Sequence, residues 1–304
     1  MQLFLEQLFN SLQLGVMLFL LASGLTLVFG IMNVINLAQG SLYMIGAFCA
    51  ATAVVHGVPF PVAVLFGAAC GGAAAVVMEF VLIRRLYERD HLDQVLVTFG
   101  VILFVNELVS IVWGRSPLFM TTPAALGGSI DLLGVPYPVY RLFVIGVGLV
   151  VAVVMYVLIG HTRIGMLVRA GATHRRIVEA LGVNVAPLFM FIFGLGGVLA
   201  GLAGAVVGPI FSVSVGMGEQ VLITTFVVIV IGGVGSVRGA FIAALLVAAV
   251  DTFSRAYIPG TLAHLFSPAA AESLGAGLSA ISIYVFMALV LIWRPRGLFT
   301  IVSR

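Results

Sequence analysis

The sequence contains no lysine, because all fourteen of its basic residues are arginine. The phosphate-binding loop of P-loop ATPases requires a lysine that reaches the β- and γ-phosphates, so this chain cannot hydrolyse ATP by that route. Schiff-base chemistry on lysine is excluded for the same reason. There are also only two cysteines, Cys49 and Cys70, and both lie in apolar runs. We expect them to pack as small hydrophobic residues, with no disulfide framework.

Charge of either sign is scarce. Charged residues make up 8% of the 304 residues and hydrophobic residues 62%, with a mean hydropathy of +1.26, whereas soluble domains carry about 25% charged residues. At about 20 apolar residues per span, the chain has room for about eight to ten transmembrane helices. The alternating strands of a membrane barrel are absent. Composition therefore predicts an all-α, polytopic membrane protein with one transmembrane domain over residues 1–304.

The apolar runs predict nine spans, and the first is expected to be retained because no signal-peptide cleavage pattern follows it. They lie near 8–30, 36–56, 60–84, 92–113, 138–160, 187–209, 218–234, 237–257 and 276–293. Arginines gather in the loops that would face the cytoplasm, which places the N-terminus outside and the C-terminus inside. This arrangement requires an odd number of spans, although eight or ten remains open if one segment is re-entrant. The net charge of +3 reflects these basic loops rather than nucleic-acid binding.

Residues 161–186 form a long polar stretch between apolar runs and carry several arginines. A loop of this length is uncommon in a membrane protein unless it has a function. Apolar residues recur within it at helical spacing, and Gly182 and Asn184 can end such a helix. One interpretation is an amphipathic helix lying on lipid. The short stripe favours the other interpretation, a helix that docks on a soluble protein partner.

The outer loop, residues 114–138, is rich in proline and glycine. It is either a plain connector or a docking site for an extracytoplasmic partner. A faint internal repeat is also visible. Gly57 begins an apolar run that reaches Glu79, and Gly233 begins one that reaches Asp251, as in the repeats of many transporters.

Four polar residues interrupt the apolar run at 30–48, namely Asn33, Asn36, Gln39 and Ser41. Uncharged polar side chains at membrane depth either pair with other helices or line a wet cavity. A broken helix here would free backbone groups to meet a polar solute. The alternative is a short hairpin at the inner membrane edge with no function.

Two acids, Glu107 and Asp251, fall inside predicted spans, where carboxylates are functional candidates. Asp251 has Arg255 four residues on, which is the spacing of a helical ion pair. Glu107 lies near the outer edge. Neither acid is therefore expected to act alone in proton coupling. The five histidines show no metal-ligand spacing, and no nucleophile and base can be paired, so neither a metal nor a catalytic residue is predicted.

Glycine pairs four residues apart, 197 with 201 and 204 with 208, predict close helix packing. The glycine-rich segment 232–239 superficially resembles a phosphate-binding loop. Because it lacks lysine and precedes a span, we interpret it as a flexible turn between two helices.

Three segments, in order, resemble the bacterial branched-chain amino acid ABC-transporter permeases of the LivH type. They are GIMNVINLAQGSLYMIGAF, TRIGMLVRAGATHRRIVEALGVNV and IGGVGSVRGAFIAALLV. The resemblance implies the membrane-spanning subunit of an ATP-driven importer in the inner membrane. It implies a solute pathway at Asn33, Asn36, Gln39 and Ser41. It also implies an ATPase-coupling segment at Ala172, Arg175, Arg176, Glu179, Ala180, Leu181 and Gly182. Many relatives have histidine at the position of Gln39 and glycine or a carboxylate near Ser41, which leaves the solute open among amino acids, urea and amides.

The resemblance further implies a LivM-like second permease, two cytoplasmic ATPases that bind ATP and magnesium, and a periplasmic or lipid-anchored solute-binding protein. The sequence contains no cofactor site of its own. The main alternative is a secondary transporter driven by H⁺ or Na⁺, for which Glu107 or Asp251 would be essential. A membrane-embedded enzyme is a third possibility, but the chain lacks the clustered acids or histidines that it would need.

Overall fold

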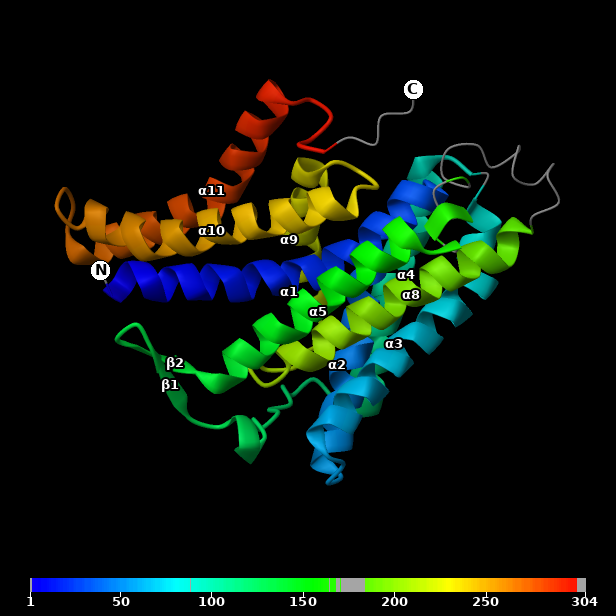
Figure 1. Ribbon diagram of the computed structural model, residues 1–304, viewed down its shortest axis with the longest axis horizontal. Coiled ribbons are helices and arrows are strands. Elements are labelled where there is room, and N and C mark those ends of the chain that lie inside the picture. The colour runs from blue at the N-terminus through cyan, green and yellow to red at the C-terminus, as the bar shows by residue number, and fades with distance from the viewer. Residues whose placement is uncertain (1, 88, 164, 168–169, 171–183, 300–304) are drawn as a thin grey trace.

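Nine α-helices make up most of the chain that the structure describes (Figure 1). The structure is a computed structural model that describes residues 2–87, 89–163, 165–167, 170 and 184–299. The helices are α1 Gln2–Met32, α2 Gln39–Val55, α3 Phe60–Val81, α4 His91–Trp113, α5 Val139–His161, α8 Val185–Val207, α9 Met217–Gly232, α10 Val237–Leu262 and α11 Pro268–Trp293. Each falls on one of the nine predicted spans, so the predicted helical membrane architecture is confirmed.

Seven of these helices are long and apolar enough to cross a membrane, but α2 and α9 are shorter. They have 17 and 16 residues. At 1.5 Å per residue they extend about 25 Å, which is less than the hydrocarbon core of about 30 Å. The sequence analysis treated them as full spans, since an apolar run does not report the depth at which its helix begins.

The helices form two packed groups that meet where α1 packs against α8. In one group α8 packs against α3, α2 and α1, and in the other α1 packs against α10 and α9, with α11 on the outside of α10. Glycines permit the closest contacts. A Cβ at Gly201 would lie 2.7 Å from the Gly67 carbonyl oxygen, and one at Gly204 would lie against the Tyr43 carbonyl. The predicted glycine packing of α8 is therefore confirmed.

The two groups repeat the same order of contacts. α2 adjoins α3 and both lie on α8, just as α9 adjoins α10 and both lie on α1. The apolar runs ending at Glu79 and Asp251 are α3 and α10, so the faint repeat in the sequence corresponds to equivalent helices. Two such halves are a common construction of transporters.

The outer loop contains a β-hairpin that the sequence analysis did not predict. Strand β1, Ser129–Leu132, pairs antiparallel with β2, Val135–Pro138. The two turn residues, Leu133 and Gly134, have φ of 56° and 85°, as a tight hairpin turn requires. The hairpin lies beside the N-terminal end of α1 (Figure 1). A short 3-10 helix, η2 Ala124–Leu126, precedes it, and another, η1 Ile83–Leu86, joins α3 to α4.

The opposite end of the molecule gathers the turn between α9 and α10 with the segment that follows α11. The amides of Leu298 and Phe299 donate to the carbonyls of Ile231 and Gly232, at 2.8 and 3.1 Å. The glycine-rich segment 232–239 is thus a turn between helices, as predicted. The two hydrogen bonds hold the backbone of this turn in place, so the predicted flexibility of the turn is not observed.

Candidate functional site

The break between α1 and α2 is built from the polar residues that the sequence analysis singled out. Asn33 ends α1 in the left-handed region, with φ of 52°, and its amide donates to the Phe29 carbonyl at 3.1 Å. Asparagine is one of the few residues that adopts this conformation at a helix end. Asn36 is fully buried, and its side-chain oxygen accepts from the Ala38 amide at 3.0 Å. Both residues therefore shape the turn.

Helix α4 supplies the remaining partners of this turn. The Ile35 amide donates to the Gln94 side chain at 3.0 Å, and the Leu37 amide donates to the Thr98 hydroxyl at 3.3 Å. Buried backbone groups outside a helix need such partners, because water does not reach them. The two α4 side chains thus hold the broken segment in place.

Gln39 ties the break to the middle of α8. Its side chain is fully buried, and its amide nitrogen donates to the Gly196 carbonyl at 2.9 Å while its oxygen accepts from Asn36 at 3.4 Å. Gly196 is the central residue of α8 and also lies against Gly24 of α1. The break is therefore deep in the helix assembly rather than a loop at its edge.

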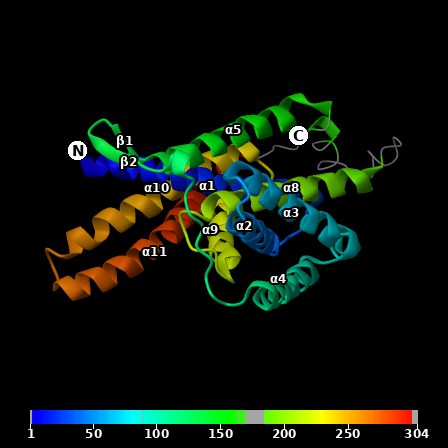
Figure 2. The same cartoon turned by 90° about the horizontal axis from the view of Figure 1, so that it is seen from below.

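Helices α2 and α9 begin at the same place. A Cβ at Gly40 would lie 2.5 Å from the Gly218 carbonyl oxygen, and a Cβ at Gly218 would meet Gly40 in the same way. Only glycine allows the two backbones to approach this closely. Figure 2 shows α9 beside α2, with α11 on one side and α4 on the other. Each helix N-terminus carries a partial positive charge, so two of them converge here.

Polar side chains surround this meeting point. Glu219, in the first turn of α9, accepts a hydrogen bond of 2.7 Å from the Asn106 amide of α4. Within the described residues, the buried Asn106 Oδ1 and the Ser41 hydroxyl of α2 have no hydrogen-bond partner. The site thus presents one carboxylate and two unoccupied polar groups at the point where two helices begin.

Asn106 and Glu219 were missed by the sequence analysis. Asn106 precedes Glu107, whose charge drew attention instead, and Glu219 lies at the edge of an apolar run. The signal available in the sequence was the short length of the predicted span at 218–234. A carboxylate at the first turn of a helix too short to cross the membrane indicates a helix that begins inside it.

The two acids that were predicted inside spans are both paired. The Arg255 side chain donates to both carboxylate oxygens of Asp251 at 2.9 Å, which confirms the predicted ion pair. Arg115 lies 3.3 Å from the Glu107 carboxylate, and both side chains are exposed. These pairs do not favour either acid as an isolated proton carrier.

Neither the cysteines nor the residue types that can ligate a metal form a further site within the described residues. Cys49 and Cys70 are free thiols on α2 and α3. Over the described ranges, no three side chains of the metal-ligating types are grouped together.

The predicted ATPase-coupling residues lie outside the described residues. They are Ala172, Arg175, Arg176, Glu179, Ala180, Leu181 and Gly182. Helix α5 ends at His161 and α8 begins at Val185, so the two helices bound the predicted loop as expected.

A helical bundle with two equivalent halves, each with a helix too short to cross the hydrocarbon core, is a construction found in membrane transporters. Comparison of the sequence with known protein families identifies the family. Residues 7–293 match the family described as the branched-chain amino acid transport system permease component, and the chain belongs to this family.

Several curated proteins are similar to the chain. The permease BraD of a high-affinity branched-chain amino acid system from Pseudomonas aeruginosa is 27% identical, over 97% of this chain and 95% of BraD. LivH from Escherichia coli K12 is 26% identical, over 84% of this chain and 87% of LivH. The ribose import permease RbsC from the same organism is 28% identical over 80% of this chain and 75% of RbsC.

The chain is also similar to a solved structure described as a metal-chelate type ABC transporter in an inward-facing conformation. The match covers 95% of this chain and 85% of the transporter chain. Its TM-score is 0.48 and its sequence identity 20%.

Proposed function

We propose that this chain forms the translocation pathway of an ATP-driven importer that moves a branched-chain amino acid, or a related small polar solute, across the bacterial inner membrane. Its family and its similarity to BraD and LivH support this assignment. ATP and magnesium bind to two partner ATPases, because this chain has no lysine for a P-loop. A LivM-like permease completes the pore, and a periplasmic or lipid-anchored binding protein delivers the solute.

The observation that carries the proposal is the position of Glu219. Its partner Asn106 precedes Trp113, the last residue of α4, by seven residues, or about 10 Å along the helix. Because tryptophan is enriched at membrane interfaces, we take Trp113 as the outer edge of the membrane. We infer that the carboxylate lies within the depth of the hydrocarbon core, where an acid must face water, a protein partner or a solute. The neighbouring Gln220 is exposed on the same short helix. We infer that this side of α9 faces the pathway and the second permease.

The chemistry of the meeting point fits a zwitterion. The start of α2 offers the positive end of a helix dipole and the unpartnered Ser41 hydroxyl, both of which suit a carboxylate. Glu219 can accept hydrogen bonds from an ammonium group. An amino acid carries both groups, whereas a sugar such as the ribose named for RbsC carries neither. In this scheme Asn36 and Gln39 hold the broken helix and Ser41 meets the solute.

Uptake of radiolabelled leucine into proteoliposomes that contain the assembled complex, with ATP supplied to the ATPases, tests this assignment. We expect Glu219→Gln to reduce uptake about tenfold or more, because a charge-assisted hydrogen bond to the ammonium is lost. Glu219→Asp, which keeps the charge, should retain more activity than the amide. Wild-type rates in Glu219→Gln would remove Glu219 from the pathway.

A further inference from the structure

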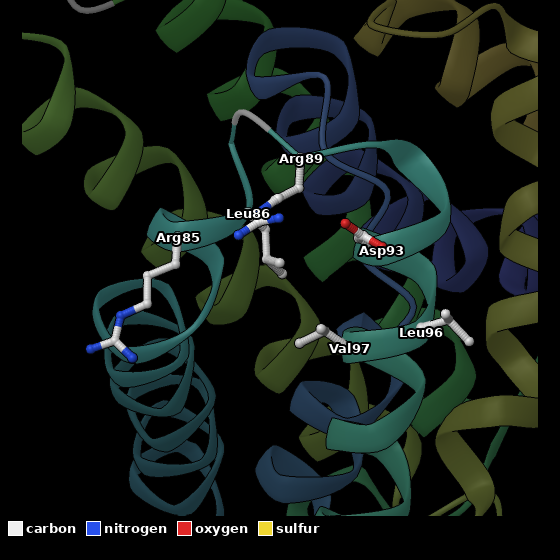
Figure 3. A pocket seen from close by; sticks show the side chains of 6 residues that line it. All are labelled: Arg85, Leu86, Arg89, Asp93, Leu96 and Val97. Carbon is white, nitrogen blue, oxygen red and sulfur yellow. The ribbon is translucent and has the colours of Figure 1, made fainter.

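A pocket lies between η1 and the first two turns of α4. It has a volume of about 400 Å³ and is lined by Arg85, Leu86, Arg89, Asp93, Leu96 and Val97 (Figure 3). The first three residues come from η1 and the turn after it, and the other three come from one side of α4. The positive-inside rule places this end of α4 at the cytoplasmic surface of the membrane.

The rim of the pocket carries two arginines, Arg85 and Arg89. Their neighbour Arg84 is bound to the buried carboxylate of Glu79 at 3.2 Å. By contrast, neither Arg85 nor Arg89 forms an ion pair within the part of the chain that the structure describes. An arginine at the membrane surface with no carboxylate partner is suited to a phosphate group.

The rim is also held in a fixed shape. The side-chain amide of Gln94 donates to the carbonyls of Leu86 and Arg89, each at 3.2 Å. These bonds fasten the turn that carries the arginines to the first turns of α4. Asp93 lies on the same rim and adds a carboxylate that accepts hydrogen bonds.

Below the rim, the same side of α4 is apolar and exposed. Asp93, Val97, Gly100 and Phe104 follow one another at helical spacing on one face. A Cβ at Gly100 would have no atom within 4 Å, and Phe104 is 67% exposed. From Asp93 to Phe104 the helix rises about 16 Å, close to the thickness of one bilayer leaflet, about 15 Å. The face therefore joins a charged rim to an exposed apolar surface about one leaflet long.

We propose that this pocket binds a phospholipid of the inner leaflet. Arg89, with Arg85 on the same rim, attracts the phosphate, and an acyl chain lies along the exposed apolar face that contains Gly100. Asp93 accepts a hydrogen bond from the head group. The ammonium of phosphatidylethanolamine and the hydroxyls of phosphatidylglycerol can donate that bond, whereas the quaternary ammonium of phosphatidylcholine has no hydrogen to donate. The site therefore selects the first two lipids over the third.

Native mass spectrometry of the purified complex, delipidated and then supplied with one of the three lipids, tests the proposal. We expect phosphatidylethanolamine or phosphatidylglycerol to be retained at least about tenfold more than phosphatidylcholine. Glycerophosphate, which has the same phosphate but no acyl chain, should not be retained. Equal retention of all three lipids would overturn the assignment of a head-group site.

Variants separate this pocket from general lipid association. The double variant Arg85→Gln and Arg89→Gln removes both charges, and Gly100→Leu places a bulky side chain in the middle of the apolar face. Each should reduce retention about tenfold. The matched controls are Arg115→Gln at the other end of α4 and Gly146→Leu in α5, where a Cβ also has open space. Both controls should bind lipid as the wild type does. The proposal fails if Gly100→Leu and Gly146→Leu retain the same amount of lipid, or if the double variant matches Arg115→Gln.

Discussion

Gln39 and Ser41 lie two residues apart in the first turn of α2, and both are buried, yet their hydrogen bonds differ. Gln39 bonds to the Gly196 carbonyl and to Asn36, while the Ser41 hydroxyl has no partner in the part of the chain described here. A buried polar group that is already paired serves the fold, and one that is unpaired is available to a ligand. Substitutions of the two residues are therefore expected to affect different properties, stability for Gln39 and transport for Ser41.

We expect Gln39→Leu to lower the free energy of unfolding by about 1–3 kcal/mol, because the buried Gly196 carbonyl loses its donor. Ser41→Ala should leave stability unchanged but slow transport. Thermal unfolding of each purified variant in detergent, combined with leucine uptake, measures both effects. Equal unfolding midpoints for the two variants would contradict the division of roles.

The sequence was sufficient to locate these polar residues but not to divide them by role. Asn36, Gln39 and Ser41 were visible because they interrupt an apolar run. Which of them is paired depends on Gly196, about 160 residues away in the chain. The contact between Asn106 and Glu219 is equally remote, so no local pattern could have revealed it.

At the scale of helices, the short α2 and α9 determine where the pathway lies. Sequence analysis placed all nine described helices, because each apolar run ends at polar, glycine or proline residues. It allowed for a broken helix at 30–48, where α2 begins, but it treated the run that forms α9 as a full span. The β-hairpin was also missed, since its strands have only four residues each and lie in a loop rich in proline.

Gly218→Ala tests the close approach of the two short helices. Its Cβ would clash with the Gly40 backbone, so we expect destabilisation of about 1–3 kcal/mol. Gly146→Ala is the matched control, because its Cβ meets open space and alanine favours a helix by about 0.5–1 kcal/mol. Thermal unfolding compares them. If Gly218→Ala proved as stable as Gly146→Ala, α2 and α9 would not meet as described.

For the whole molecule, the two equivalent groups of helices provide a passage. The chain lacks the lysine that ATP hydrolysis by a P-loop would require. The proposed coupling segment at 172–182 lies between α5 and α8, both of which pack against α1. The two helices that flank the proposed segment in the sequence are therefore both in contact with α1. In this account, ATP hydrolysis on the partners changes the relative positions of the two groups.

We expect a coupling variant, Glu179→Arg combined with Leu181→Asp, to abolish ATP-driven uptake while leaving the fold intact, because these residues belong to the proposed ATPase contact rather than to the described core. Circular dichroism and thermal unfolding would check the fold. Uptake by the variant at the wild-type rate would move the coupling contact elsewhere.

The most direct test is solute uptake by proteoliposomes that contain either the full complex or this chain alone. We predict accumulation against a gradient only when the partner ATPases and ATP are both present, with no response to an imposed H⁺ or Na⁺ gradient. Uphill transport by the chain alone, driven by either ion, would contradict the account and favour a secondary transporter.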